Sequence, residues 1–243
     1  MTLRSQRGVT LLELLIAVSL VALLSTGMLL AMRTSVLTYE KTSRRLESNR
    51  KIVGIEHTLT SQISGIIPVM GLCSSPSGVP APAPFFGGNE TILRLVTNFS
   101  TAEGARGYPQ IVQYRVLPAI GGGVRLVAIE QPYTGPQSTI GYCTGPIAQE
   151  LPAAALPPPP AGAKAFTLAD HLAYCRISYH APYDINIFLE VPWVTLWNRL
   201  VLPAGVKIEM RPLAPVAGGL PQLDVTVPIR VTRDPLQSYE DHF

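Results

Sequence analysis

The sequence is poor in charged residues and lacks the motifs that mark common classes of enzyme. Charged residues make up 14% of the 243 residues, against about 25% in an average soluble domain. No G-x-S-x-G, H-E-x-x-H or P-loop pattern occurs, so the usual serine nucleophile, zinc pair and phosphate cradle are missing. The net charge of +3 is too small to favour nucleic acid as the main partner. These absences argue against an enzyme and against a nucleic-acid-binding domain.

Cysteine is also scarce, with three residues far apart and no C-x-x-C pair. If most of the chain lies outside the cytoplasm, one disulfide is expected and one thiol is left over. Cys143 and Cys175 flank a proline-rich insert and are the predicted pair, although spacing alone does not determine connectivity.

A zinc site is conceivable from four residues in the same part of the chain. His171 and Cys175 are four apart, so a helix would place them on one face, and His180 and Cys143 would complete the set. Zinc motifs usually contain tighter pairs, and Cys175 falls where the pattern changes from helix to strand. Structural roles are therefore preferred, and we predict neither a metal nor a cofactor.

Long apolar runs are present at the N-terminus. The 19 residues from Leu14 to Met32 carry no charge, and as a helix they would span about 28 Å, close to the hydrocarbon core of a bilayer. Glu13 lies at the start of this run. A carboxylate costs about 2.5–3.5 kcal/mol at mid-membrane and less near the interface, so a partner is expected to hold Glu13 in place.

The predicted fold class is α+β, with a long N-terminal transmembrane and amphipathic α-helix packed on a C-terminal antiparallel β-rich globular domain. The helix is predicted over 9–67, because a helical stripe continues after the apolar run until Pro68 and Gly71 end it. The residues of that stripe are Ile52, Ile55, Leu59, Ile63 and Ile66.

The remaining residues, 68–243, predict strands joined by turns and loops. Gly121–Gly123 predict a hairpin, and T-L-A-D at Thr167 predicts a short helix through a capping box. The proline-rich segments 76–84 and 152–160 predict surface loops. The predicted strands are Thr91–Thr97, Ile111–Leu117, Val124–Glu130, Cys175–His180, Asp184–Val191, Val194–Leu202, Val206–Met210 and Leu223–Thr232.

The N-terminal segment R-S-Q-R-G-V-T-L-L-E-L-L-I-A-V resembles the signature of type IV pilins and of the pseudopilins of type II secretion. It does not fit a secretory signal, because the apolar run is too long and no A-x-A exit follows it. In that family a prepilin peptidase cuts after the glycine and methylates the new N-terminus. The resemblance implies a leader over 1–8, cleavage between Gly8 and Val9, N-methylation at Val9 and an assembly salt bridge at Glu13.

This cleavage would explain Glu13 physically. A new amine at Val9 would lie about one helical turn from the carboxylate, in the same or a neighbouring subunit, and such a pair is strongly attractive at low dielectric. The resemblance implies a single pass of the inner membrane over 9–32, with 68–243 in the periplasm. Basic residues flank both ends of the span, so charge alone does not orient it.

The rest of the chain bears a weaker resemblance to J-type minor pseudopilins of type II secretion and W-type minor pilins. The likeness rests on the long helix, the β-rich body and the segment W-V-T-L-W-N-R-L-V-L, and the apolar helix has no proline, which favours a minor subunit. It implies a structural subunit at or near a filament tip, acting in filament initiation. The implied partners are other minor and major pilins or pseudopilins, the prepilin peptidase and the inner membrane.

Two other functions remain open. A DNA-binding minor pilin of a DNA-uptake pilus would need the scattered Arg106, Arg115 and Arg125 to form a surface. A plain membrane-anchored envelope protein would need no cleavage, and Glu13 would then be a chance residue. In the body, Trp193, Trp197 and Tyr183 would be contact residues if exposed, although packing in the core is the preferred role for each.

Overall fold

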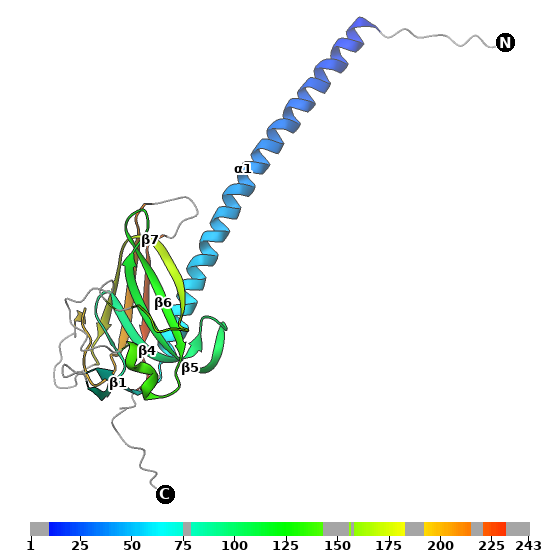
Figure 1. Ribbon diagram of the computed structural model, residues 1–243. Helices are drawn as coiled ribbons and strands as arrows, with labels where there is room; N and C mark the ends of the chain where they lie inside the picture. Colours follow the sequence, from blue (N-terminus) through cyan, green and yellow to red (C-terminus); the bar gives the residue numbers. More distant parts are fainter. Residues whose placement is uncertain are drawn as a thin grey trace. The chain divides into compact units, whose positions relative to one another are not determined.

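The computed structural model describes residues 10–74, 79–142, 156, 158–182, 192–214 and 221–231. The chain forms two units, Met1–Ser48 and Asn49–Phe243. The elements in chain order, shown in Figure 1, are α1 (Leu11–Ser64), β1 (Met70–Ser74), β2 (Pro80–Pro84), β3 (Gly87–Gly88), β4 (Ile92–Ser100), β5 (Ala105–Pro118), β6 (Val124–Pro132), the 3₁₀ helix η1 (Pro136–Tyr142), β7 (Lys164–His180), β8 (Trp193–Val194), β9 (Gly205–Pro212) and β10 (Leu223–Pro228).

In the first unit, α1 is a helix whose apolar side chains are exposed. It is long and apolar enough to cross a membrane, and its most apolar 18 residues have a mean hydropathy of 2.5. The hydroxyl groups of Ser19, Thr26 and Thr34 donate hydrogen bonds to helix carbonyls three or four residues earlier. These side chains therefore bring no unsatisfied donor into apolar surroundings.

In the second unit, the described strands form an eight-stranded antiparallel sheet in the order β10-β9-β7-β6-β5-β4-β3, with β8 paired to β7. The predicted hairpin at Gly121–Gly123 joins β5 to β6, and its three glycines have φ values of 90°, 106° and 74°, which favour glycine. The long strand β7 pairs β6 with its first half and β9 with its second half. A separate two-stranded sheet contains β1 and β2.

One face of the sheet carries the main core, and the C-terminal turns of α1 contribute to it. Ile55, Leu59 and Ile63 are at most 5% exposed, as the helical stripe in the sequence predicts. The sheet residues in this cluster alternate along their strands, as period-two side-chain geometry requires. They include Leu93, Leu95, Val112, Tyr114, Leu126, Ile177 and Ile208. The α+β fold of a long helix packed on an antiparallel sheet is therefore confirmed.

The opposite face of the sheet carries a second, smaller core. Phe85, Val96, Ile111, Ile129 and Tyr142 pack together there. They come from the segment after β2, from β4, β5 and β6, and from the end of η1. The central strands are therefore apolar on both faces.

A buried polar network joins α1 to the sheet inside this unit. The Gln62 side-chain amide donates to Glu130 Oε1 at 2.5 Å and accepts a hydrogen bond from the Tyr114 hydroxyl. Thr101 N–H also donates to Glu130, at 2.8 Å. Burial, and then the charge of Glu130, raise the pKa of Tyr114 well above its usual range, so its hydroxyl remains a donor. The network determines where the last turn of α1 meets the sheet.

The sequence P-A-P-A-P at Pro80–Pro84 forms strand β2, where a loop over 76–84 was predicted. Phe85 N–H donates to the Val69 carbonyl at 3.1 Å, and the pairing register continues with Ala83 opposite Gly71 and Ala81 opposite Cys73. Because alternate residues of a strand point their N–H groups to opposite sides, the N–H groups of the two alanines point toward β1. The three prolines occupy the positions whose N–H groups would point away from β1, where no hydrogen-bond donor is needed.

Three further predictions differ from the structure. T-L-A-D at Thr167 lies inside β7 and not in a helix, because Thr167 and Ala169 pair with Val127 and Leu126 of β6. Of the predicted strand Val194–Leu202, Val194 alone lies in a regular strand, at the end of β8, and Trp197 forms an isolated bridge with Gly88. α1 ends at Ser64, earlier than predicted, because Ile66 pairs with Thr97 as a β-bridge. The predicted strand Asp184–Val191 and most of the loop 152–160 lie outside the described residues.

The predicted disulfide between Cys143 and Cys175 is wrong, since Cys175 is a free thiol. Its side chain faces the main core and is 7% exposed, because it shares a face of β7 with Ile177 and Tyr179. Cys73 is disulfide-bonded, and Cys143 lies outside the described residues. Burial raises the pKa of the Cys175 thiol to about 12, so this thiol stays protonated at neutral pH.

Chemical labelling of the full chain, purified without reductant, tests this assignment. Iodoacetamide at pH 8 is expected to leave Cys175 unlabelled in the folded chain, because only an exposed thiolate reacts, and to label it fully in urea. Cys73 is expected to label only after reduction. Peptide mapping before reduction should link Cys73 to Cys143, the one other cysteine in the sequence. Rapid labelling of Cys175 in the native chain would contradict the assignment.

Substitution of Leu59 tests the packing of α1 on the sheet. Leu59→Ala removes a fully buried side chain and is expected to lower the free energy of unfolding by about 2–5 kcal/mol. Val53→Ala is the matched control, because Val53 lies on the same helix and is 62% exposed. Urea unfolding of the full chain in detergent, followed by tryptophan fluorescence, measures both. Equal effects of the two variants would contradict the packing.

Candidate functional site

The first turn of α1 begins at a helix cap that was not predicted from the sequence. The amide N–H of Glu13 donates to Thr10 Oγ1 at 3.3 Å, and the amide N–H of Leu14 donates to the Thr10 carbonyl at 3.2 Å. Thr10 is therefore the N-cap and Glu13 is the third residue of the helix, as in the capping pattern T-x-x-E. The sequence T-L-L-E at residues 10–13 carries this pattern and could have predicted the cap.

Glu13 lies among exposed apolar side chains in this first turn. Leu12 and Leu14 beside it are 69% and 57% exposed. Within the described part of the chain no cation forms an ion pair with Glu13. Its one favourable electrostatic neighbour there is the positive end of the helix dipole. Gly8 and Val9, the predicted cleavage and methylation positions, lie outside the described residues.

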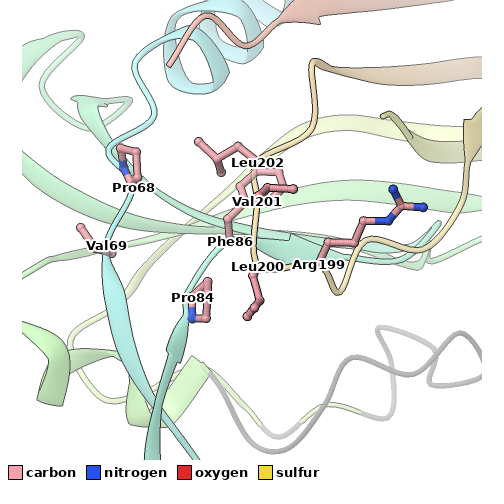
Figure 2. A pocket seen from close by; sticks show the side chains of 8 residues that line it. All are labelled: Pro68, Val69, Pro84, Phe86, Arg199, Leu200, Val201 and Leu202. Atoms are coloured by element: carbon pink, nitrogen blue, oxygen red, sulfur yellow. The ribbon is translucent and has the colours of Figure 1, made fainter. Parts of the chain in front are cut away.

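The body carries an apolar groove beside the end of the long helix. Figure 2 shows the eight residues that line it, and Arg199 contributes the one charged side chain among them. Leu200 and Val201 are 60% and 50% exposed. The groove is shallow: about 240 Å³ of space lies over these residues, most of it open solvent, and the enclosed part is about 10 Å³. Its lining residues are Pro68, Val69, Pro84, Phe86, Arg199, Leu200, Val201 and Leu202.

One wall of this groove is held by Trp197, which is fully buried. Its backbone exchanges two hydrogen bonds with Gly88, at 2.8 and 3.0 Å, and its indole N–H donates to the Val201 carbonyl at 2.9 Å. The Arg199 guanidinium lies 5.0 Å from the centre of the indole ring. The loop that carries Leu200 and Val201 is thus positioned by the core and does not depend on a ligand.

Gly88 is required for this arrangement. A Cβ atom there would lie 2.0 Å from the Tyr179 hydroxyl oxygen and 2.2 Å from the Ile92 carbonyl oxygen, which no real side chain tolerates. The Tyr179 hydroxyl can donate to the carbonyls of Asn89 and Ile92, at 3.1 and 3.0 Å. Burial raises the pKa of Tyr179 well above its usual range, so this donor is retained at any physiological pH.

The remaining candidate residues do not come together in one site within the described part of the chain. Trp197 has the core role that was preferred, Trp193 is 37% exposed, and Tyr183 lies outside the described residues. His171 is exposed on β7, whereas Cys175 is buried. The zinc hypothesis assumed that His171 and Cys175 share one face of a helix, but both lie on strand β7. Within the described segments no three His, Cys, Asp or Glu residues could hold a metal ion.

The scattered arginines do not form one exposed basic patch. Arg115 is 5% exposed on β5, and burial lowers its pKa. Arg106 is exposed at the start of the same strand. A DNA-binding surface needs several accessible cations on one face, so these residues give that function no support.

Residues 3–29 match the family model described as the prokaryotic N-terminal methylation motif. The match includes Gly8, Val9 and Glu13, together with Thr10, which begins the helix in the structure. This motif is the type IV pilin signature, and it supports a pilin or pseudopilin and a structural role over an enzymatic one. No curated protein matches the chain.

Proposed function

We propose that the protein is a minor pilin or pseudopilin, a structural subunit at or near the tip of a type II secretion pseudopilus or a type IV pilus. The observation that carries the proposal is the coincidence of the methylation motif at 3–29 with the start of the helix at Thr10. A peptidase that cuts after Gly8 would release a chain that begins one residue before this helix cap.

Cleavage would supply the partner that Glu13 lacks in the described residues. The amine created at Val9 carries a positive charge, and the first turn of α1 places the Glu13 carboxylate three residues beyond the cap. A neighbouring subunit could offer its own Val9 amine to the same carboxylate. Either pairing offsets the cost of a charged group near the membrane interface, and the second also aligns two subunits along their helices.

The apolar part of α1 would serve in two places. In the inner membrane its exposed leucines and valines contact lipid as a single span over 9–32, with the leader 1–8 on the cytoplasmic side and the body 68–243 in the periplasm. In a filament the same side chains pack on the helices of other subunits. The absence of proline from this helix supports the minor class of subunit, and filament initiation at the tip follows from that assignment.

Mass spectrometry of the N-terminal peptide tests the proposal. The chain is isolated from its native membrane, with and without the prepilin peptidase. The expected peptide begins at Val9, carries one added methyl group and is lost without the peptidase. Gly8→Leu should block cleavage and leave the leader attached, while Ser5→Ala in the leader should not.

An intact Met1 end in both samples would contradict the proposal. Glu13 would then be an unexplained carboxylate in a plain membrane anchor, and the groove on the body would become the main candidate site.

Substitution of Glu13 separates processing from assembly. Glu13→Gln is expected to leave cleavage after Gly8 intact and to reduce association with other subunits that carry the methylation motif by at least about tenfold. A lost charge-assisted pair at low dielectric is expected to cost more than about 1.4 kcal/mol. Glu13→Asp keeps the charge and should retain part of the association. Glu40→Gln is the control, because Glu40 is an exposed carboxylate on the same helix.

Co-purification from detergent-solubilised membranes measures the association. If the Glu13→Gln chain associates as fully as the parent, Glu13 does not take part in the assembly contact. The conclusion about cleavage after Gly8 would not change.

A further inference from the structure

The apolar groove has the chemistry of a protein-docking site, and its size indicates what it can hold. Its enclosed space is only about 10 Å³, room for one water-sized group, and the larger volume over its residues is open solvent. It therefore lacks the enclosure of a small-molecule site and suits a shallow contact with side chains of a protein partner. Leu200 and Val201, which are half exposed or more, lie together with Pro68, Val69 and Pro84 in one lining (Figure 2).

The groove is formed before any partner binds. On one side Trp197 anchors the loop through its two backbone hydrogen bonds to Gly88 and its indole bond to Val201. On the other side the Phe85 N–H bond to the Val69 carbonyl, at 3.1 Å, holds β1 and β2 together. A preformed apolar surface binds with little ordering cost, and clustered exposed apolar residues commonly mark interaction sites.

Arg199 adds a charge preference to this surface. Its side chain is exposed, and its guanidinium lies over the Trp197 ring at 5.0 Å. In the segments that the structure describes, no carboxylate forms an ion pair with it. The stacking on Trp197 limits where the guanidinium can move and leaves its N–H groups available. A carboxylate on the partner would complete this site.

The proline edge of β2 limits how a partner can bind. Pro80, Pro82 and Pro84 occupy the outward positions of that strand and offer no N–H groups, so an added strand could not form a regular ladder there. Pro84 is also a lining residue of the groove. Recognition must therefore use side chains, which favours a partner segment whose own backbone is already hydrogen-bonded, such as a helix.

We infer that the groove docks an amphipathic helical segment of a different subunit, with one or two aliphatic side chains in the lining and an aspartate or glutamate about one turn away on Arg199. The chemistry of this segment follows from the groove, and only its assignment to another subunit rests on the proposed function.

Site-specific photo-crosslinking of the full chain in its native membrane tests this inference. The photoreactive analogue p-benzoylphenylalanine replaces Leu200 in one chain and Thr226 in the control. Thr226 is exposed on β10 and is not among the groove residues. The expected adduct forms only from position 200, and its partner peptide contains aliphatic residues with Asp or Glu within four positions.

Charge variants of Arg199 make the result specific to the site. Arg199→Glu in the Leu200 chain is expected to lower the adduct yield roughly fivefold or more, since an attraction becomes a repulsion at the rim of the contact. Arg199→Lys should retain most of the yield. Thermal unfolding of both variants should stay close to that of the parent, because Arg199 is exposed and its one lost contact in the described residues is the stacking on Trp197.

Four results would overturn the inference: no adduct from position 200, equal adducts from positions 200 and 226, a yield that Arg199→Glu leaves unchanged, or an adduct only to lipid or to a second copy. The N-terminal peptide of the same samples distinguishes the two proposals. A Val9 start without an adduct would reject the groove alone, whereas an adduct with an intact Met1 would reject the filament function alone.

Discussion

The packing of one stripe of α1 on the antiparallel sheet is the interaction on which the body depends. Ile55, Leu59 and Ile63 cover apolar strand residues that would otherwise face water, and a sheet with an uncovered apolar face is not stable by itself. Gln62 lies in the same stripe but is polar and fully buried. Its hydrogen bonds to Glu130 and Tyr114 mean that the helix meets the sheet in one register, since any shift would leave buried polar groups unpaired.

The N-terminal part of the same helix has the opposite property, because its apolar side chains are exposed. In water this surface would be costly, at roughly 25 cal/mol for each Å² of apolar area. The hydroxyls of Ser19, Thr26 and Thr34 are satisfied by the helix itself. The helix is therefore suited to lipid or to the helices of other subunits, and in both settings Glu13 is the one residue in the first turn that needs a charged partner.

The surface of the body has one strand edge that resists strand addition and one groove that can bind a partner. The outward prolines of β2 block strand addition, while the loop held by Trp197 presents Leu200, Val201 and Arg199 beside Pro84. This combination disfavours unspecific pairing of edges and leaves side-chain recognition as the available mode of binding. A subunit that must join a filament in one orientation would benefit from both features.

The long helix, its buried stripe and most central strands could be predicted from the sequence, because periods of 3.6 and 2 are properties of neighbouring residues. The methylation motif and Glu13 were found in the same way, since their spacing is local. Only the tertiary structure decided the rest. T-L-L-E at Thr10 caps a helix while T-L-A-D at Thr167 lies in a strand, because β7 gains hydrogen bonds and burial from β6 and β9, which are distant in sequence. In the same way, the free thiol of Cys175, the proline strand and the loop at Trp197 depend on partners that no local pattern reveals.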